Sequence, residues 1–163
     1  MKKLFMAMAL MMAALGAKAQ VTTNVRVGGG YNTGAPCITG LFQANIPFQR
    51  GGKLTFSPSV EFDYSTHVDC DGTRNLMLPL QLGYKVPMGN NLLFFPKVGP
   101  AVGYDISSGD GFNVGPAAEF AFEGTHFVVA IGGYYSVKDV EYDDYYYDYK
   151  TPFNISLTLG YKF

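Results

Sequence analysis

The residues closest to a catalytic set in this chain lie around His67. Ser65, His67 and Asp69 would supply a nucleophile, a base and an acid. Catalysis requires these groups to contact one another in a defined order, and a short polar loop brings such residue types together by chance. His126, the second histidine, belongs to a segment expected at the opposite end of the molecule. We therefore predict that the protein is not an enzyme and assign no catalytic residue.

Two other segments have the residue types of ligand sites without their spacing. Asp105 to Gly111 has carboxylates spaced somewhat like a calcium loop, but the distal Glu of an EF-hand is missing. Gly28 to Gly30 is not a dinucleotide fingerprint, since no helix follows and the glycine spacing differs. The sequence predicts no metal site and no cofactor.

A stretch from Asp139 to Lys150 combines tyrosines with carboxylates and is the most distinctive polar segment. Tyrosine offers rigid, amphipathic contact area at low entropic cost, as in antibody paratopes. A site for a hard cation and a plain strand extension with a solvated acidic rim are the alternatives. The candidate recognition loop consists of Glu141, Tyr142, Asp143, Asp144, Tyr145, Tyr146, Tyr147, Asp148 and Tyr149.

The N-terminal segment has the three parts of a secretory signal. Lys2 and Lys3 precede an apolar run from Leu4 to Leu15, and Ala17 to Ala19 forms a small-residue cleavage site. The run is too short for a membrane helix, which needs about 20 residues. We predict a signal peptide over residues 1–19 and one domain over residues 20–163.

The composition indicates that much of the mature chain faces a solvent other than water. The chain has 20 Gly, 12 Tyr, 13 Phe and no Trp, and 15% of its residues are charged, against about 25% in soluble domains. The net charge of −1 gives no basic surface for nucleic acid.

Apolar and polar residues alternate with a period of two along eight segments, which predicts half-buried strands. In the clearest of them, Phe153, Leu157 and Phe163 share one face, and Asn154, Ser156 and Thr158 the other. Short connections alternate with longer ones, the layout of a bacterial outer-membrane barrel. We predict an all-β fold, an eight-stranded antiparallel transmembrane β-barrel with up-and-down topology in the cell outer membrane. The predicted strands are residues 21–31, 38–48, 53–65, 75–86, 91–104, 112–122, 126–137 and 153–163.

The polar face of these strands is expected to line the lumen, because its residues are mostly small. A lipid-facing Arg or Lys would cost about 2 to 4 kcal/mol at the bilayer midplane. The few charged residues should therefore point inward and form an ion-paired plug, which disfavours a narrow channel. They are Arg26, Glu61, Asp63, Lys85, Lys97, Glu119 and Lys162.

The two cysteines and the strand prolines lead to two further expectations. We predict that Cys37 and Cys70 lie in neighbouring extracellular loops and form a disulfide, as an even count in an exported chain suggests; such a bond would stabilise by about 3 to 4 kcal/mol. Proline cannot donate to a strand ladder, so bulges or shortened strands are expected at the strand prolines. These are Pro47, Pro58, Pro79, Pro96, Pro100 and Pro116.

The chain resembles the small PorT-like outer-membrane β-barrel family of Bacteroidota in four short motifs. They are Leu54–Phe62, Leu76–Tyr84, Val98–Tyr104 and Gly160–Phe163. The resemblance implies contact with outer-membrane lipid and recognition of Tyr161 and Phe163, at the end of the last strand, by the barrel-assembly machinery.

No specific activity follows from the resemblance, because family members include adhesion-like, secretion-associated and unassigned barrels. We expect a monomeric, non-enzymatic barrel with a structural or surface-recognition role, its loops contacting an extracellular ligand or protein. The alternatives are a narrow channel or transport barrel, a secretion-associated envelope component, and a lipid-modifying outer-membrane enzyme.

Overall fold

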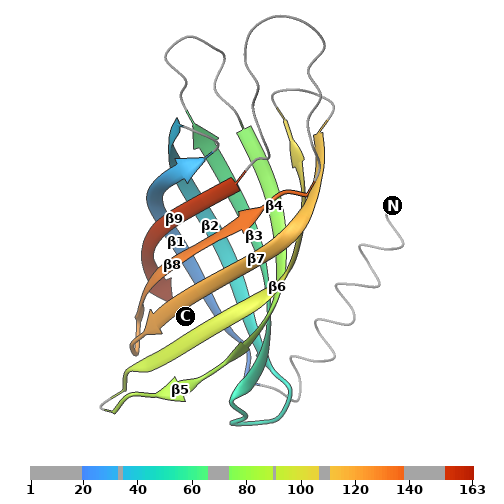
Figure 1. Ribbon diagram of the computed structural model, residues 1–163. Coiled ribbons are helices and arrows are strands. Elements are labelled where there is room, and N and C mark those ends of the chain that lie inside the picture. Colours follow the sequence, from blue (N-terminus) through green and yellow to red (C-terminus); the bar gives the residue numbers. More distant parts are fainter. Residues whose placement is uncertain (1–19, 33–34, 66–73, 90, 107–110, 138–152) are drawn as a thin grey trace, which may run out of the picture.

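The computed structural model describes residues 20–32, 35–65, 74–89, 91–106, 111–137 and 153–163, which form a closed antiparallel β-barrel (Figure 1). Strands that follow one another in the sequence pair with each other, except that β4 and β5 both pair with β6, and β1 pairs with β9 to close the barrel. β5 continues β4 beyond Lys85, so the wall has eight strands. The strands are β1 (Thr22–Asn32), β2 (Ala35–Pro47), β3 (Leu54–Ser65), β4 (Arg74–Tyr84), β5 (Val86–Pro87), β6 (Leu93–Asp105), β7 (Gly111–Glu123), β8 (Phe127–Tyr135) and β9 (Phe153–Lys162).

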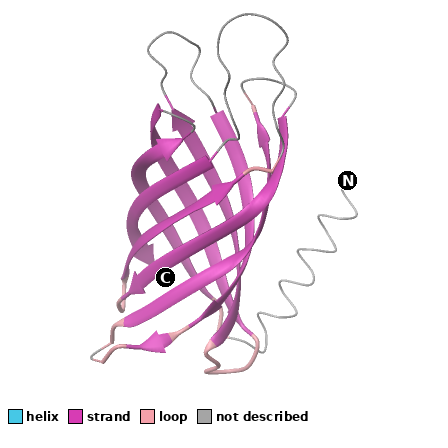
Figure 2. Cartoon of the chain, viewed as in Figure 1, coloured by secondary structure: helices cyan, strands magenta, loops and turns pink. Residues whose placement is uncertain are grey.

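The predicted fold class is confirmed, with the expected up-and-down order of strands. Figure 2 shows only strands and connecting segments among the described residues. No helix within these ranges has the length and apolar character needed to cross a membrane. The predicted signal peptide at residues 1–19 lies outside the described residues.

Alternation along each strand separates an outer apolar surface from an inner polar one. In β9, Leu157 and Leu159 are 59% and 65% exposed, whereas Ser156 and Thr158, which alternate with them along the strand, are buried. Successive side chains of a strand point to opposite faces, so this order of residues fixes which face is outside. Ala44 and Ile46 of β2 depart from the rule, since they share the outward register of Phe42 and are nevertheless buried.

The connections at one end of the barrel are short, and we call this end the turn end. It holds the connections between β2 and β3, between β5 and β6, and between β7 and β8. Gly51 and Gly89 have φ values of 73° and 95° there, which glycine adopts without steric cost. The opposite end, at which β1 ends and β9 begins, is called the loop end (Figure 1).

The strand prolines are accommodated without the expected bulges. Between β4 and β6 the paired residues change from Pro79 and Ala101 to Leu82 and Val98 with the register unchanged. The same holds across Pro58 in both of its ladders. A bulge would have shifted the register by one residue. The prolines remove individual ladder contacts and leave the strands extended.

Candidate functional site in the barrel lumen

The lumen contains the polar and charged side chains of the barrel. Small hydroxyl and amide residues line it from every part of the wall, and ion pairs cross its middle. Its buried polar residues include Asn24, Thr39, Gln43, Asn45, Thr55, Ser57, Ser59, Asn113, Ser156 and Thr158. This arrangement inverts that of a soluble protein, in which the interior is apolar.

A central ion cluster, which we define as Arg26, Lys97, Glu119 and Gln43, crosses the middle of the lumen. Lys97 Nζ lies 2.5 Å from Glu119 Oε1, and Arg26 Nη2 lies 2.8 Å from Glu119 Oε2. Lys97 Nζ also donates to Gln43 Oε1 at 2.6 Å. The side chains of Arg26 and Lys97 are fully buried.

Strand register explains how this cluster forms. Lys97 of β6 and Glu119 of β7 are direct cross-strand partners, and such opposite charges attract each other. Arg26 and Gln43 come from the adjacent strands β1 and β2 and meet this pair across the lumen. Four strands are therefore tied together by side chains as well as by the ladder.

A second polar group lies around Asp63. Thr39 donates to Asp63 Oδ1 at 2.5 Å, and Tyr134 donates to Asp63 Oδ2 at 3.1 Å. Two hydroxyl donors therefore satisfy this buried carboxylate without an ion pair. Glu61, two residues earlier on the same strand, also faces the lumen and is 6% exposed.

A third group lies at the turn end. Lys162 Nζ lies 3.6 Å from Glu123 Oε2, and Asn45 donates to Glu123 Oε1 at 3.4 Å. Lys85 and Lys97 both lie over the buried ring of Phe95, 5.4 and 4.3 Å from its centroid. These cation–π contacts hold the apolar ring inside an otherwise polar lumen.

The seven charged residues expected in the lumen differ in depth. Arg26, Glu61, Asp63, Lys97 and Glu119 are buried in the middle of the barrel, each at most 6% exposed. Lys85 and Lys162 are half-buried at the turn end.

Sequence reasoning missed several lumenal residues. Glu123 lies just beyond the predicted strand 112–122, yet it ends β7 and is fully buried. Phe95 is not among the residues expected in the lumen. It lies two positions before Lys97 on β6, however, and therefore points to the same side of the wall. Gln43 and Tyr134 alternate with apolar neighbours and so belong to the polar face, but nothing in the sequence marks them as partners of Lys97 and Asp63. Phe95 and Glu123 each lie an even number of positions from a charged residue expected in the lumen, Lys97 and Glu119 respectively. This spacing would have identified both as lumenal.

The predicted disulfide is wrong, because Cys37 is a free, buried cysteine. It lies in β2 rather than in a loop, since the first connection is shorter than predicted and β2 already begins at Ala35. Inside the lumen its Sγ accepts from Asn154 Nδ2 at 3.7 Å and lies 4.0 Å from Thr39 Oγ1. Cys70 lies outside the described residues.

Other predicted features also fall outside the described residues. They include the candidate recognition loop (141–149) and two of the three residues considered as a catalytic set, His67 and Asp69. Ser65, the third, is buried at the end of β3. Tyr161 and Phe163 are exposed at the turn end, where Tyr161 stacks on His126 with ring centroids 5.6 Å apart.

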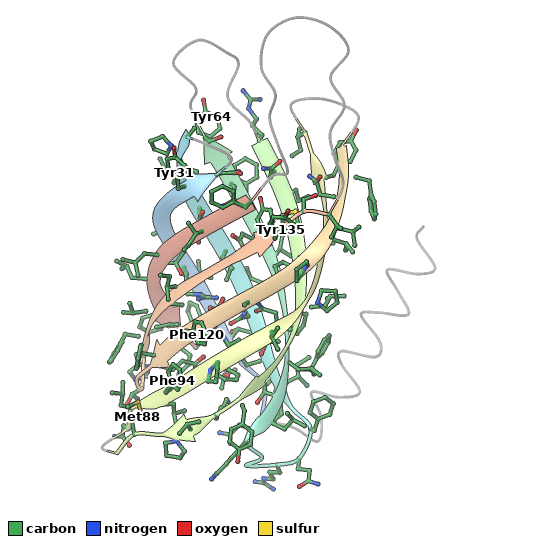
Figure 3. All side chains as sticks on the ribbon, in the orientation of Figure 1. Tyr31, Tyr64, Met88, Phe94, Phe120 and Tyr135 are labelled. Atoms are coloured by element: carbon green, nitrogen blue, oxygen red, sulfur yellow. The ribbon has the colours of Figure 1, made fainter. Side chains whose placement is uncertain are left out.

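The outer surface of the barrel is apolar over the height of the strands. Figure 3 shows Tyr31, Tyr64 and Tyr135 toward the loop end, and Met88, Phe94 and Phe120 toward the turn end, all directed away from the lumen. Phe94 packs against Phe120 and Phe122, with centroids 6.2 and 5.3 Å apart. Aromatic residues near both ends of an apolar band are expected at the two membrane interfaces.

A closed barrel that is polar inside and apolar outside satisfies every condition for crossing a bilayer with strands. It defines this protein as a transmembrane β-barrel of the outer-membrane type. Its place is the outer membrane, with lipid around the apolar wall.

Comparisons with known proteins agree with this class. The outer membrane enzyme PagL is 15% identical with a TM-score of 0.64, and the likeness covers 85% of this chain and 97% of that chain. The N-terminal barrel domain of Pseudomonas aeruginosa OprF and the Yersinia pestis attachment invasion locus protein Ail are each 12% identical, with TM-scores of 0.47. They cover 87% and 88% of this chain, and 97% and 96% of their own chains.

The likeness to PagL shows a shared fold and leaves the activity open, because function depends on the site and not on the fold. No family model and no curated protein matches the sequence. The resemblance to PorT-like barrels therefore stays a prediction.

Proposed function

We propose that this protein is a non-conducting, non-enzymatic barrel that anchors recognition loops at the cell surface, in the manner of a PorT-like envelope protein. The observation that carries the proposal is the central ion cluster. Arg26, Lys97 and Glu119 meet in the middle of the lumen with side chains at most 7% exposed. A lumen closed in this way supports a structural role for the wall, which leaves function to the segments beyond it.

Packing around the cluster supports the same conclusion. An eight-stranded barrel is only wide enough for its own side chains to fill it. The cavity next to Glu119 has a volume of about 10 Å³, which is room for about one water molecule. A conducting pore needs a continuous water path, and the cluster interrupts it.

The absence of enzyme activity is part of the proposal and is a prediction from the sequence. His67 and Asp69 lie outside the described residues. His126 is the only histidine among them, and it stacks on Tyr161 at the turn end. Ser65, which lies two positions before His67 in the sequence, is buried at the opposite end of the barrel.

Conductance in a planar bilayer tests the closed lumen. We expect the wild-type protein to give no sustained single-channel current. A triple variant, Arg26→Ala, Lys97→Ala and Glu119→Ala, removes the crossing side chains without leaving an unpaired charge among them, and should conduct. Steady current from the wild-type protein would refute the closed barrel.

Deletion of residues 140–149 tests the recognition role separately. We expect the shortened protein to keep its heat-modifiable gel mobility, because the deletion leaves β8 and β9 complete, and to lose binding at the cell surface. Deletion of residues 108–109, in a different connection, is the control. Surface binding that survives the longer deletion would rule out this loop as the recognition element.

A further inference from the structure

Three buried carboxylates in the middle of the lumen are satisfied in different ways. Glu119 pairs with both nearby cations, and Asp63 accepts from two hydroxyl groups. Glu61 is only 6% exposed. Within the described residues it has no hydrogen bond and no ion pair. An ionised carboxylate left in this state would be strongly unfavourable.

Glu61 lies on the wall of the small lumenal cavity of about 10 Å³. Most of the polar side chains around this cavity carry oxygen atoms that can act as ligands. Gln81, on the neighbouring strand β4, is 3% exposed, and its Oε1 atom is buried without a partner. The polar lining residues are Ser59, Glu61, Gln81, Glu119, Ser156 and Thr158.

The charges around the cavity do not balance. Arg26 and Lys97 supply two positive charges, and Glu61, Asp63 and Glu119 supply three negative ones. The remaining lumenal cations, Lys85 and Lys162, lie at the turn end near Glu123. The middle of the lumen therefore has an excess of one negative charge, located at the carboxylate that lacks a partner.

We propose that this cavity binds one hard monovalent cation of the sodium class, held by Glu61 and oxygen atoms of the cavity wall. Hard cations prefer oxygen ligands, and the cavity accommodates an occupant the size of one water molecule. A single positive charge would neutralise the excess negative charge in the middle of the lumen. Among the described residues no three His, Cys, Asp or Glu side chains are grouped to hold a metal, which disfavours a divalent or transition-metal ion.

The competing occupant is a proton on Glu61, and thermal unfolding of the wild-type barrel distinguishes the two. The midpoint of the heat-modifiable gel transition would be measured in a zwitterionic detergent at neutral pH. Sodium chloride would replace choline chloride stepwise at constant ionic strength. A bound cation stabilises the folded state by mass action, so the midpoint should rise with sodium and then saturate. Equal midpoints in both salts would overturn the proposal.

Two variants test whether the effect arises at Glu61. Glu61→Gln keeps the size of the side chain and removes its charge, so the sodium dependence should be lost. Glu123→Gln is the control, because it removes a buried lumenal carboxylate that neither lines the cavity nor belongs to the charge balance in the middle of the lumen. Sodium dependence should persist in it. Sodium dependence that persists in Glu61→Gln would overturn the site, and if that variant does not fold the wild-type titration decides alone.

Discussion

At the scale of single residues, Glu119 is the most consequential side chain of the barrel. It is the shared partner of Arg26 and Lys97, both of which have fully buried side chains. Buried ion pairs add little stability by themselves, but removal of one partner leaves an uncompensated charge behind. The stability of the lumen should therefore depend on Glu119 more than on either cation alone.

Glu119→Gln is expected to destabilise the folded barrel by about 3 to 5 kcal/mol, because two buried cations would lose their carboxylate. Urea titration of the protein folded in lipid vesicles measures this free energy of unfolding. Glu123→Gln is the control, since Glu123 has one cation at the longer distance of 3.6 Å, and its loss should be clearly smaller. Equal losses in both variants would contradict a special role for Glu119.

At the scale of elements, closure of the barrel depends on how tightly β1 and β9 approach each other. A Cβ atom added to Gly28 would collide with the carbonyl oxygen of Leu157, and one added to Gly30 with that of Ile155. The glycines in β1 therefore allow the first and last strands to pair along the full seam. Relief of crowding, rather than ligand binding, accounts for this glycine run.

Gly28→Ala should weaken the seam by about 1 to 3 kcal/mol, the usual range for overpacking in a dense structure. Gly40→Ala in β2 is a matched control, because a Cβ atom added there meets nothing within 4 Å. The measurement is again urea unfolding in vesicles. If both alanine variants unfold at the same urea concentration, close approach at the seam does not require glycine.

The strands were predictable because one physical signal, alternation with a period of two, runs through the whole barrel. Leu157 and Ser156 show their opposite faces in sequence and in structure alike. The ends of strands were less predictable. Pro36 and Gly34 favour a turn, which places Cys37 in a loop, but strand pairing with β1 extends β2 as far as Ala35. Pairing with a neighbour is a tertiary effect that local turn preferences do not contain.

The lumenal partners were less predictable still. The alternation of polar and apolar residues identified Glu119, Lys97 and Arg26 as lumenal residues. Their contacts with one another depend on strand register and on the tilt of the closed barrel. Glu61 illustrates the limit, since its sequence context resembles that of Asp63 and only the arrangement in space leaves it without a partner.

At the scale of the whole molecule, the barrel separates its chemistry into layers. Lipid contacts the outer apolar wall, while the charges that would be unfavourable there are collected inside. At the turn end, the last strand places Tyr161 on the outer surface and Lys162 beside the lumenal Glu123. Phe163, the residue after β9, donates a backbone hydrogen bond to Thr23 O at 2.8 Å, and its ring is edge-on to Tyr161 with centroids 5.0 Å apart.

The assembly role expected for Phe163 can be separated from its structural role, because these contacts are small. The backbone hydrogen bond survives any side-chain change, and the side chain is 70% exposed. Its ring contact is of a type that contributes about 0.5 to 1.5 kcal/mol. Phe163→Ser should therefore leave the stability of the barrel refolded in vitro nearly unchanged, and yet strongly reduce the amount assembled in cells, as measured by heat-modifiable mobility.

Phe153→Ser is the matched control, because it changes the same residue type at the opposite end of β9, where Phe153 packs on Tyr31 with centroids 6.4 Å apart. It should alter stability by a similar small amount and leave assembly in cells intact. Recognition of the strand end by the assembly machinery predicts this difference between two similar substitutions, whereas a purely structural role predicts none. Equal assembly of the two variants would show that Phe163 contributes only packing.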